Sequence, residues 1–255
     1  MNNLKKTISD ILTIARRSLL KLKHNPEQFA DVIIMPVFFM LVFAFLFGGA
    51  IAGDTKAYLP ILIPGILAQT LLGISSATGT AINTDMEKGI FDRFKSLPMA
   101  RIAPLAGSLV ADIPRYAISA AFAILTGYLI GWRPEAGFGA VLVGTLFMIF
   151  VTFSISWIFA TIGLLVNKAA TIQVFSQMIM MILTFMSNAF VPTETLPKVL
   201  QTFTRFNPVT HMIAALREIF ATGAIGFDFW LSLGMGVAMI LIFAPITLRI
   251  YNKKI

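Results

Sequence analysis

Asp112 and Arg115 are two ionisable residues inside an otherwise apolar stretch of the chain, which runs from about Ile102 to Trp132. If this stretch crosses a membrane, each charge costs about 3 kcal/mol or more unless it pairs or faces water. Residues three apart lie on one face of a helix, so the carboxylate and the guanidinium can neutralise each other. Two interpretations stay open: a gate or pathway element of a transporter, or a structural ion pair near the inner interface.

Other side chains and motifs that could perform chemistry are sparse. The chain has no cysteine, and its two histidines, His24 and His211, lie far apart without metal-ligand spacing. The patterns GxxxxGK[ST], HExxH, GxSxG and DxDxDG do not occur in the sequence. Phosphate-loop ATP hydrolysis therefore loses its usual support, as do zinc protease, serine hydrolase and calcium-site chemistry. We expect no catalytic, metal-binding or cofactor-binding residue.

The composition is that of a membrane protein. Hydrophobic residues make up 57% of the chain and charged residues 13%, and the mean hydropathy is +0.84. A soluble domain has about 25% charged residues. The lipid bilayer is thus the expected surroundings. The net charge of +8 would suggest a nucleic-acid partner in a soluble protein. We expect none here, because cytoplasmic loops of membrane proteins collect Lys and Arg.

Six apolar stretches are long enough to cross a bilayer, for which a helix needs about 20 residues. We therefore predict an all-α membrane protein with a single transmembrane domain over 1–255. The predicted spans are Val32 to Gly53, Ala57 to Thr84, Ile102 to Trp132, Ala136 to Asn167, Ala169 to Thr193 and Phe229 to Leu248. The first apolar run begins only after residue 28, so we expect no cleavable signal peptide.

The distribution of Lys and Arg predicts the orientation. Six spans place both termini on one side. Of the 20 Lys and Arg residues, 14 fall in the segments on that side, and five fall on the other: Lys56, Arg133, Lys198, Arg205 and Arg217. Positive residues gather on the cytoplasmic side. Both termini are therefore predicted to be cytoplasmic.

The segment 1–24 predicts an amphipathic helix. Its apolar residues share one face at helical spacing: Leu4, Ile8, Ile11, Leu12, Ala15, Leu19 and Leu22. Basic residues lie off that stripe. Such a helix lies in the plane of the inner leaflet, and a tail that faces water is the alternative.

The loop 85–101, with the sequence DMEKGIFDRFKSLPMAR, is too patterned for a simple connector. It combines an apolar patch with charges of both signs and ends its short helix at Pro98. The apolar residues are Ile90, Phe91, Phe94 and Leu97, and the charged ones are Glu87, Lys88, Asp92, Arg93 and Lys95. Aromatic anchors among charges are typical of a docking element. The residues alone leave a second interpretation equally open, an interfacial loop whose Phe rings enter the headgroup layer.

The segment 192–226 predicts two short amphipathic helices between the fifth and sixth spans. One apolar stripe comprises Leu196, Val199, Leu200, Phe203 and Phe206, and the other Val209, Met212, Ile213, Leu216 and Phe220. Neither helix is long enough to span. A re-entrant pair or a cap at the outer leaflet is expected. Asp31 and Asp228 stand at span boundaries, where we expect interfacial roles.

Two long motifs resemble signatures of a known family. EKGIFDRFKSLPMARIAPLAGSLVADIPR (87–115) and SNAFVPTETLPKVLQTFTRFNPVTHMIAALR (187–217) are similar to the two signatures of type 2 ABC transporter permeases of the daunorubicin-resistance-like branch. The resemblance implies a permease of a bacterial or archaeal plasma membrane that pairs with a second copy of itself. Two separate ABC ATP-binding subunits would bind the ATP and dock from the cytoplasm.

The resemblance also assigns roles to the three unusual segments. The helix in 1–24 would be the connecting helix, the loop 85–101 the coupling loop, and 192–226 the re-entrant external helices. The coupling residues would be Glu87, Ile90, Phe91, Asp92, Arg93, Phe94, Leu97 and Pro98.

The cargo implied by the resemblance is an amphipathic drug, antibiotic or lipid, exported at the dimer interface. Three alternatives stay open: an export permease for polysaccharide or teichoic-acid chains, a self-sufficient secondary transporter or channel, and a membrane scaffold subunit.

Overall fold

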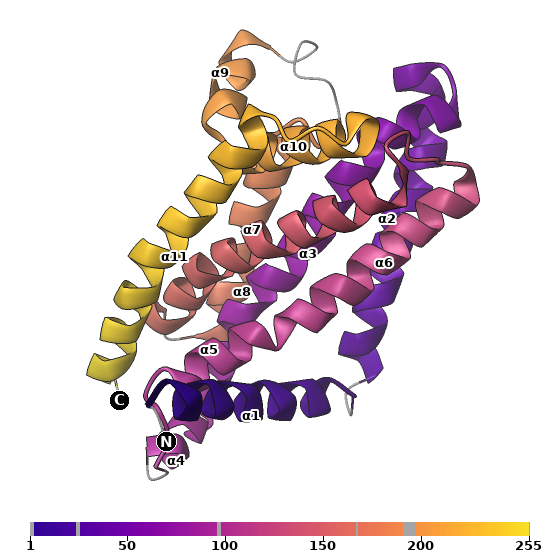
Figure 1. Ribbon diagram of the computed structural model, residues 1–255. Helices are drawn as coiled ribbons and strands as arrows, with labels where there is room; N and C mark the ends of the chain where they lie inside the picture. Colours follow the sequence, from indigo (N-terminus) through magenta and orange to yellow (C-terminus); the bar gives the residue numbers. More distant parts are fainter. Residues whose placement is uncertain (1–2, 24–25, 96–97, 167, 191–196, 255) are drawn as a thin grey trace.

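The computed structural model describes residues 3–23, 26–95, 98–166, 168–190 and 197–254, and their side chains except those of 3, 4, 21–23, 26–29, 92, 93 and 95. Within these ranges the chain is helical and contains no strand, as predicted (Figure 1). The helices are α1 (Asn3–Lys23), α2 (Pro26–Ala52), α3 (Thr55–Glu87), α4 (Ile90–Lys95), α5 (Ala103–Val110), α6 (Asp112–Ile130), α7 (Gly137–Leu165), α8 (Ala169–Phe185), α9 (Lys198–Phe206), α10 (Pro208–Thr222) and α11 (Phe227–Lys254).

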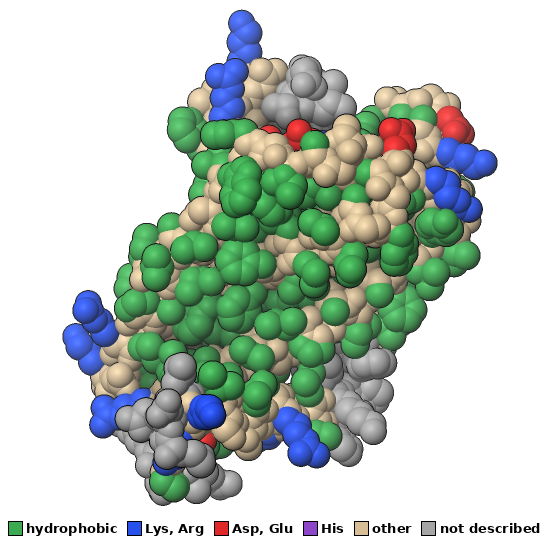
Figure 2. Space-filling model, in the orientation of Figure 1, with side chains coloured by type: hydrophobic (Ala, Val, Ile, Leu, Met, Phe, Trp, Pro, Cys, Tyr) green, Lys and Arg blue, Asp and Glu red, His purple; other side chains and the backbone are tan. Residues whose placement is uncertain are grey.

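The long helices run between two ends of the molecule (Figure 1). One end carries α1, α4 and both ends of the chain, and we call it the α4 end. The other carries α9 and α10 and is called the α10 end. Hydrophobic side chains cover the middle of the face in Figure 2, and Lys and Arg side chains gather near the two ends. An apolar belt between two charged ends is the surface of a multi-pass membrane protein.

Five helical segments are long and apolar enough to cross a membrane: Ala30–Ala52, Thr55–Glu87, Ala103–Ile130, Gly137–Leu165 and Phe227–Lys254. They match five of the six predicted spans. The fifth predicted span differs, because α8 has 17 residues and ends at Phe185, not at Thr193. The turn that follows holds Ser187 to Phe190, all buried in the protein. The six-span arrangement therefore stays a prediction.

Helix α3 is the centre of the fold. It packs against α2, α6, α7, α8 and α10, and 78% of its most apolar window is buried. Glycine allows the closest of these contacts. A Cβ atom on Gly163 of α7 would lie 2.3 Å from the carbonyl oxygen of Gly79, so the α3 and α7 backbones meet without side chains between them. The amide of Asn83 donates to the carbonyls of Gly163 and Val166, at 3.1 and 2.8 Å, and so satisfies the end of α7.

Helix α1 lies across the ends of the longer helices, beside α5 (Figure 1). It forms as predicted. Ile14 is buried against Gly107 of α5, and Ala15 of the predicted stripe is buried beside it, whereas Ile8 and Leu12 of the stripe are exposed on the single chain. The placement of the stripe in the inner leaflet stays a prediction.

The two short helices of the predicted external segment are present as α9 and α10. The predicted stripe of α10 is buried, whereas Val199 and Phe206 of α9 are each 81% exposed. Asn207 caps α10 by accepting from the amide of Val209, and it ties the start of α10 to the end of α8 by donating to the carbonyls of Leu183 and Met186. Leu196 and residues 192–195 lie outside the described residues. Re-entry of this pair into the membrane stays a prediction.

Candidate transport cavity and coupling loop

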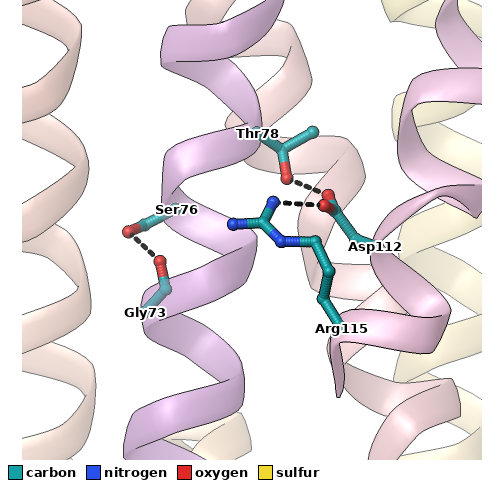
Figure 3. Close-up of polar contacts among 5 residues, drawn as sticks. All are labelled: Gly73, Ser76, Thr78, Asp112 and Arg115. Carbon is teal, nitrogen blue, oxygen red and sulfur yellow. Dashed lines mark hydrogen bonds and ion pairs between the residues drawn. The ribbon is translucent and has the colours of Figure 1, made fainter. Parts of the chain in front are cut away.

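Asp112 and Arg115 form an ion pair on α6. Arg115 Nη1 lies 2.7 Å from Asp112 Oδ1, and the hydroxyl of Thr78 on α3 donates to Asp112 Oδ2 at 2.5 Å. Figure 3 shows the guanidinium extending from α6 toward α3. Asp112 is 4% exposed. The carboxylate is therefore buried between two helices and bound from both.

The sequence folds locally in a way that tolerates this buried charge. A single turn residue, Ala111, separates α5 from α6, so Asp112 stands in the first turn of α6. A carboxylate at a helix N-terminus is stabilised by the partial positive charge there. The helix end, the guanidinium and the Thr78 hydroxyl together offset the desolvation of the carboxylate.

A polar cavity of about 520 Å³ adjoins the ion pair. Its lining comes from α1 to α3, the α5–α6 segment and α8: Ser18, Leu19, Asp31, Ser76, Ala77, Thr78, Thr80, Ala81, Thr84, Asp85, Ser108, Ala111, Asp112, Arg115, Gln173 and Gln177. The α3 wall consists of small side chains over nearly three turns, which leaves the space open. The volume lies within the range of small-molecule sites, about 300–1,000 Å³.

The chemistry of the cavity is that of binding, not of covalent catalysis. Carboxylates, amides and hydroxyls offer hydrogen-bond partners, and Ala77, Ala81 and Leu19 offer apolar contact. In the described part of the chain no three acidic or His side chains gather in a way that could hold a metal ion. The Arg115 side chain is 19% exposed and lines the cavity, so a molecule in the cavity can contact it.

The predicted coupling loop lies at the α4 end, directly after the cavity wall. Asp85 lines the cavity, α3 ends at Glu87, and Gly89 takes a positive φ of 62° before α4 begins at Ile90. The turn needs glycine there, because side chains rarely adopt that backbone conformation. One continuous helix, α3, therefore connects the cavity to the loop.

Contacts from two other helices, α1 and α11, hold this loop. Arg17 of α1 lies over the ring of Phe94, 5.1 Å from its centroid, and its Nη1 is 4.0 Å from Asp85 Oδ2. The amide of Ala100 donates to the carboxylate of Asp10 at 2.9 Å. The ring of Phe91 packs edge-on against Tyr251 of α11, with centroids 5.3 Å apart.

The predicted coupling residues divide into inward and outward groups. Glu87 and Pro98 are exposed, and Ile90 and Phe94 are partly buried. Phe91 is only 3% exposed and packs in an apolar cluster of this chain, and its part in docking a partner stays a prediction. Leu97 lies outside the described residues, as do the side chains of Asp92 and Arg93.

Sequence reasoning missed the structural role of Arg217. Its guanidinium on α10 donates to the carbonyls of Ile61, Asn188 and Ala189, at 2.9, 2.5 and 3.3 Å. It thereby joins α10, α3 and the turn after α8. No sequence signal identifies it, because all three acceptors are backbone carbonyls distant in the chain.

His211 and Asp228 also meet only in the folded chain. His211 Nδ1 lies 2.7 Å from Asp228 Oδ1, and Nε2 lies 2.9 Å from the carbonyl oxygen of Arg205. The sequence suggested only two separate interfacial residues. The contact instead joins α9, α10 and α11 at the α10 end.

The comparison with protein families decides the class of this molecule. The model of the ABC-2 type transporter family matches residues 9–221. The chain belongs to this family. The matched region contains the ion pair, the cavity lining and the coupling loop, and it stops before α11.

Proteins described as transport permeases resemble the chain over most of its length. The Daunorubicin resistance ABC transporter permease protein DrrB1 of Streptomyces coeruleorubidus is 39% identical over 247 residues, which cover 97% of this chain and 87% of that protein. The Probable doxorubicin resistance ABC transporter permease protein DrrC of Mycobacterium tuberculosis is 24% identical, over 85% of this chain and 78% of that protein. The Putative transport permease ycf38 of Cyanophora paradoxa is 22% identical, over 96% and 89%. The resemblance to daunorubicin-type permeases is confirmed.

Proposed function

We propose that this ABC-2 family chain is the membrane subunit of an ATP-driven exporter. A separate ABC ATP-binding subunit would bind and hydrolyse ATP, and the permease would have no active site or cofactor of its own. One observation carries the proposal: the polar cavity and the coupling loop lie at the same end of the single helix α3, at Ser76 to Asp85 and after Glu87. A displacement of α4 by a partner would move the cavity wall directly.

The proposed cargo is an amphipathic drug, antibiotic or lipid that leaves the cytoplasm or the inner leaflet. The cavity lining supports this class, because apolar Leu19 and Ala81 stand beside polar Asp31 and Gln173. The names of two relatives refer to daunorubicin and doxorubicin resistance. They support a hydrophobic small molecule as the cargo over a polysaccharide.

The proposed topology has six spans, both termini in the cytoplasm and one transmembrane domain in the plasma membrane of a bacterium or archaeon. Helix α1 and the last turn of α11 lie at the same end of the molecule (Figure 1), which supports an even number of crossings. Five long helices give an odd number, and α8 would be the remaining span. Its 17 residues extend about 26 Å at 1.5 Å per residue, close to the thickness of the hydrocarbon core.

The proposed assembly is a homodimer of permeases with two ATP-binding subunits. Large apolar side chains on α2 and α8 are exposed on the single chain: Phe38, Phe45 and Leu46 on α2, and Val174, Met178 and Met181 on α8. A second copy would cover part of these two faces, and lipid would cover the rest.

Reconstitution of the chain with its ATP-binding subunit in proteoliposomes tests the function. We expect ATP-dependent movement of an amphipathic fluorescent cargo, reduced by Ala81→Phe, which fills the cavity. Ala221→Phe on the exposed end of α10 is the matched control and should leave transport unchanged. Transport by the purified chain alone under an ion gradient, without ATP, would contradict the proposal.

Cysteine labelling tests the topology, because the chain has no native cysteine. Thr202→Cys on α9 and Lys253→Cys near the end of α11 are both exposed positions. A membrane-impermeant maleimide should label Thr202→Cys in intact cells, and Lys253→Cys only after the membrane is opened. The reverse pattern would show that the orientation is wrong.

A further inference from the structure

Helix α11 makes contacts at both ends of the molecule. It runs without interruption from Phe227 to Lys254, 28 residues, which span about 42 Å. Near its last turn Tyr251 contacts Phe91 of α4, and in its first turn Asp228 contacts His211 of α10. The family match ends at residue 221 and so does not include this helix.

The contact at the α4 end is closely packed. Phe91 is 3% and Tyr251 5% exposed, and the two rings meet edge to face at an angle of 75°. Edge-to-face pairs at this distance contribute stability beyond that of the buried area. Both rings belong to a small apolar cluster, separate from the main core, that also contains Ile82 of α3 and Trp157 and Leu164 of α7. The cluster thus connects the end of α11 with the helix that lines the cavity.

Helix α4 depends on such contacts for its position. It has only six residues, Ile90–Lys95, and an isolated helix of that length is not stable in water. Among the described side chains, Phe91 holds it on Tyr251 and Phe94 holds it under Arg17. Loss of the Tyr251 ring would remove this ring contact and leave α4 held by Arg17 and by the rest of the apolar cluster.

Between these two contacts α11 packs along α7 with one face, while most of its surface is exposed on the single chain. It lies along α7, where the hydroxyls of Thr161 and Thr247 are 2.7 Å apart and Phe147 stacks on Phe229 with centroids 4.6 Å apart. Gly236 leaves so little space that an added Cβ would lie 3.1 Å from Ser154 Oγ. A displacement of the Tyr251 end is therefore shared by the α7–α11 pair.

We infer that Tyr251 is a positioning residue that seats the coupling helix α4 on α11, so that α11 forms a second route of coupling beside α3. The inference rests on the proposed function, because it assigns the contact to the transmission of an ATPase-driven movement. The Asp228–His211 contact extends this route to α9 and α10.

The test compares Tyr251→Ala, Tyr251→Phe and the control Trp230→Ala, which removes an exposed ring from the same helix. Each permease is reconstituted with its ATP-binding subunit, and cargo transported per ATP hydrolysed is measured. We expect Tyr251→Ala to lower this ratio about twofold to tenfold, the effect of losing one aromatic pair, with assembly retained. Tyr251→Phe and Trp230→Ala should keep the ratio of the unaltered complex.

Two results would overturn the inference. Tyr251→Ala with an unchanged ratio would show that the contact between Tyr251 and Phe91 plays no part in coupling. Tyr251→Phe as impaired as Tyr251→Ala would assign the effect to the hydroxyl instead of the ring contact. If the unaltered complex itself shows no ATP-dependent transport, the proposed function fails, which is a different result from an intact ratio in the variants.

A double variant decides the question even if Tyr251→Ala does not fold. Phe91→Cys with Tyr251→Cys replaces the ring pair by two thiols in a chain without other cysteines. We expect a short bifunctional methanethiosulfonate, which spans a gap longer than a direct disulfide can, to link the two thiols and restore the transport ratio, and reduction to remove the link again. Failure to link the two positions would contradict the α4–α11 contact, and a formed link without restored coupling would contradict its role.

Discussion

Replacing Arg115 with Met removes the cation from a buried ion pair and keeps a side chain of similar length. Asp112, which is 4% exposed in the unaltered chain, would keep the Thr78 hydroxyl as its hydrogen-bond partner and its place in the first turn of α6. Asp112→Asn is the complementary change, because the amide oxygen still accepts from Thr78, whereas Arg115, 19% exposed, loses its counter-ion. The double variant Asp112→Asn with Arg115→Met has neither charge.

The structure predicts unequal effects for the three variants. Loss of one partner of a buried ion pair typically costs about 3–5 kcal/mol of unfolding free energy. The α6 N-terminus and the adjacent cavity lower this for Arg115→Met to about 2–3 kcal/mol. Asp112→Asn loses one charge-assisted hydrogen bond, about 1–2 kcal/mol. The double variant leaves no unpaired buried charge and should lose only about 1 kcal/mol.

Thermal unfolding of the purified variants in detergent measures the order of stability. A loss of 2–3 kcal/mol corresponds to a fall in Tm of about 5–10 °C for a chain of this size. The double variant should unfold at a higher temperature than Arg115→Met alone. Ser76→Ala changes a neighbouring cavity residue without touching the pair and serves as the control.

Additive losses of stability in the double variant would refute the predicted interaction. If the two single losses add up in the double variant, Asp112 and Arg115 do not interact, since residues in contact depart from additivity by about 0.5–3 kcal/mol. An Arg115→Met variant as stable as the unaltered chain would show that the carboxylate is well hydrated. The reasoning from burial would then be wrong.

Three further predictions concern packing. Gly163→Val should prevent stable folding, because a Cβ there would lie 2.3 Å from a backbone oxygen. The control Gly73→Val has open space around the Cβ and should fold. Expression level and thermal stability of the two variants check this prediction. Arg217→Lys should lower the unfolding free energy by about 1–3 kcal/mol, since an ammonium cannot match the planar guanidinium, and equal Tm values would contradict this. His211→Ala should loosen α9 and α10, seen as faster amide hydrogen exchange in these helices but not in α3; unchanged exchange would show that the Asp228 contact contributes no local stability.

Much of the candidate site was predictable because helical spacing is local. The spacing of Asp112 and Arg115 places them on one face of a helix in any fold, and the structure has them at 2.7 Å. The short helix before Pro98 and the two helices of the external segment also follow from local patterns. The role of the loop 85–101 in coupling to an ATP-binding subunit stays a prediction.

The inward turn of Phe91 and the contact of His211 with Asp228 could not be predicted. An apolar ring in a loop between spans can face lipid, a partner subunit or the chain itself, and all three have the same local pattern. Tyr251 is 160 residues away from Phe91 in sequence. Only the packing of α11 along α7 brings its ring beneath α4.

The sequence by itself determined the class of molecule, because a chain with 57% hydrophobic residues and long uncharged stretches can satisfy its backbone in lipid only as helices. It did not determine which helix is central. The buried α3 segment has a mean hydropathy of 1.7 and the largely exposed α11 segment 2.2, since in a bilayer lipid-facing surface is as apolar as the core. Only tertiary packing, guided by small residues such as Gly79 and Gly163, placed α3 at the centre, opened the cavity on its polar side and brought the ends of α11 to α4 and α10.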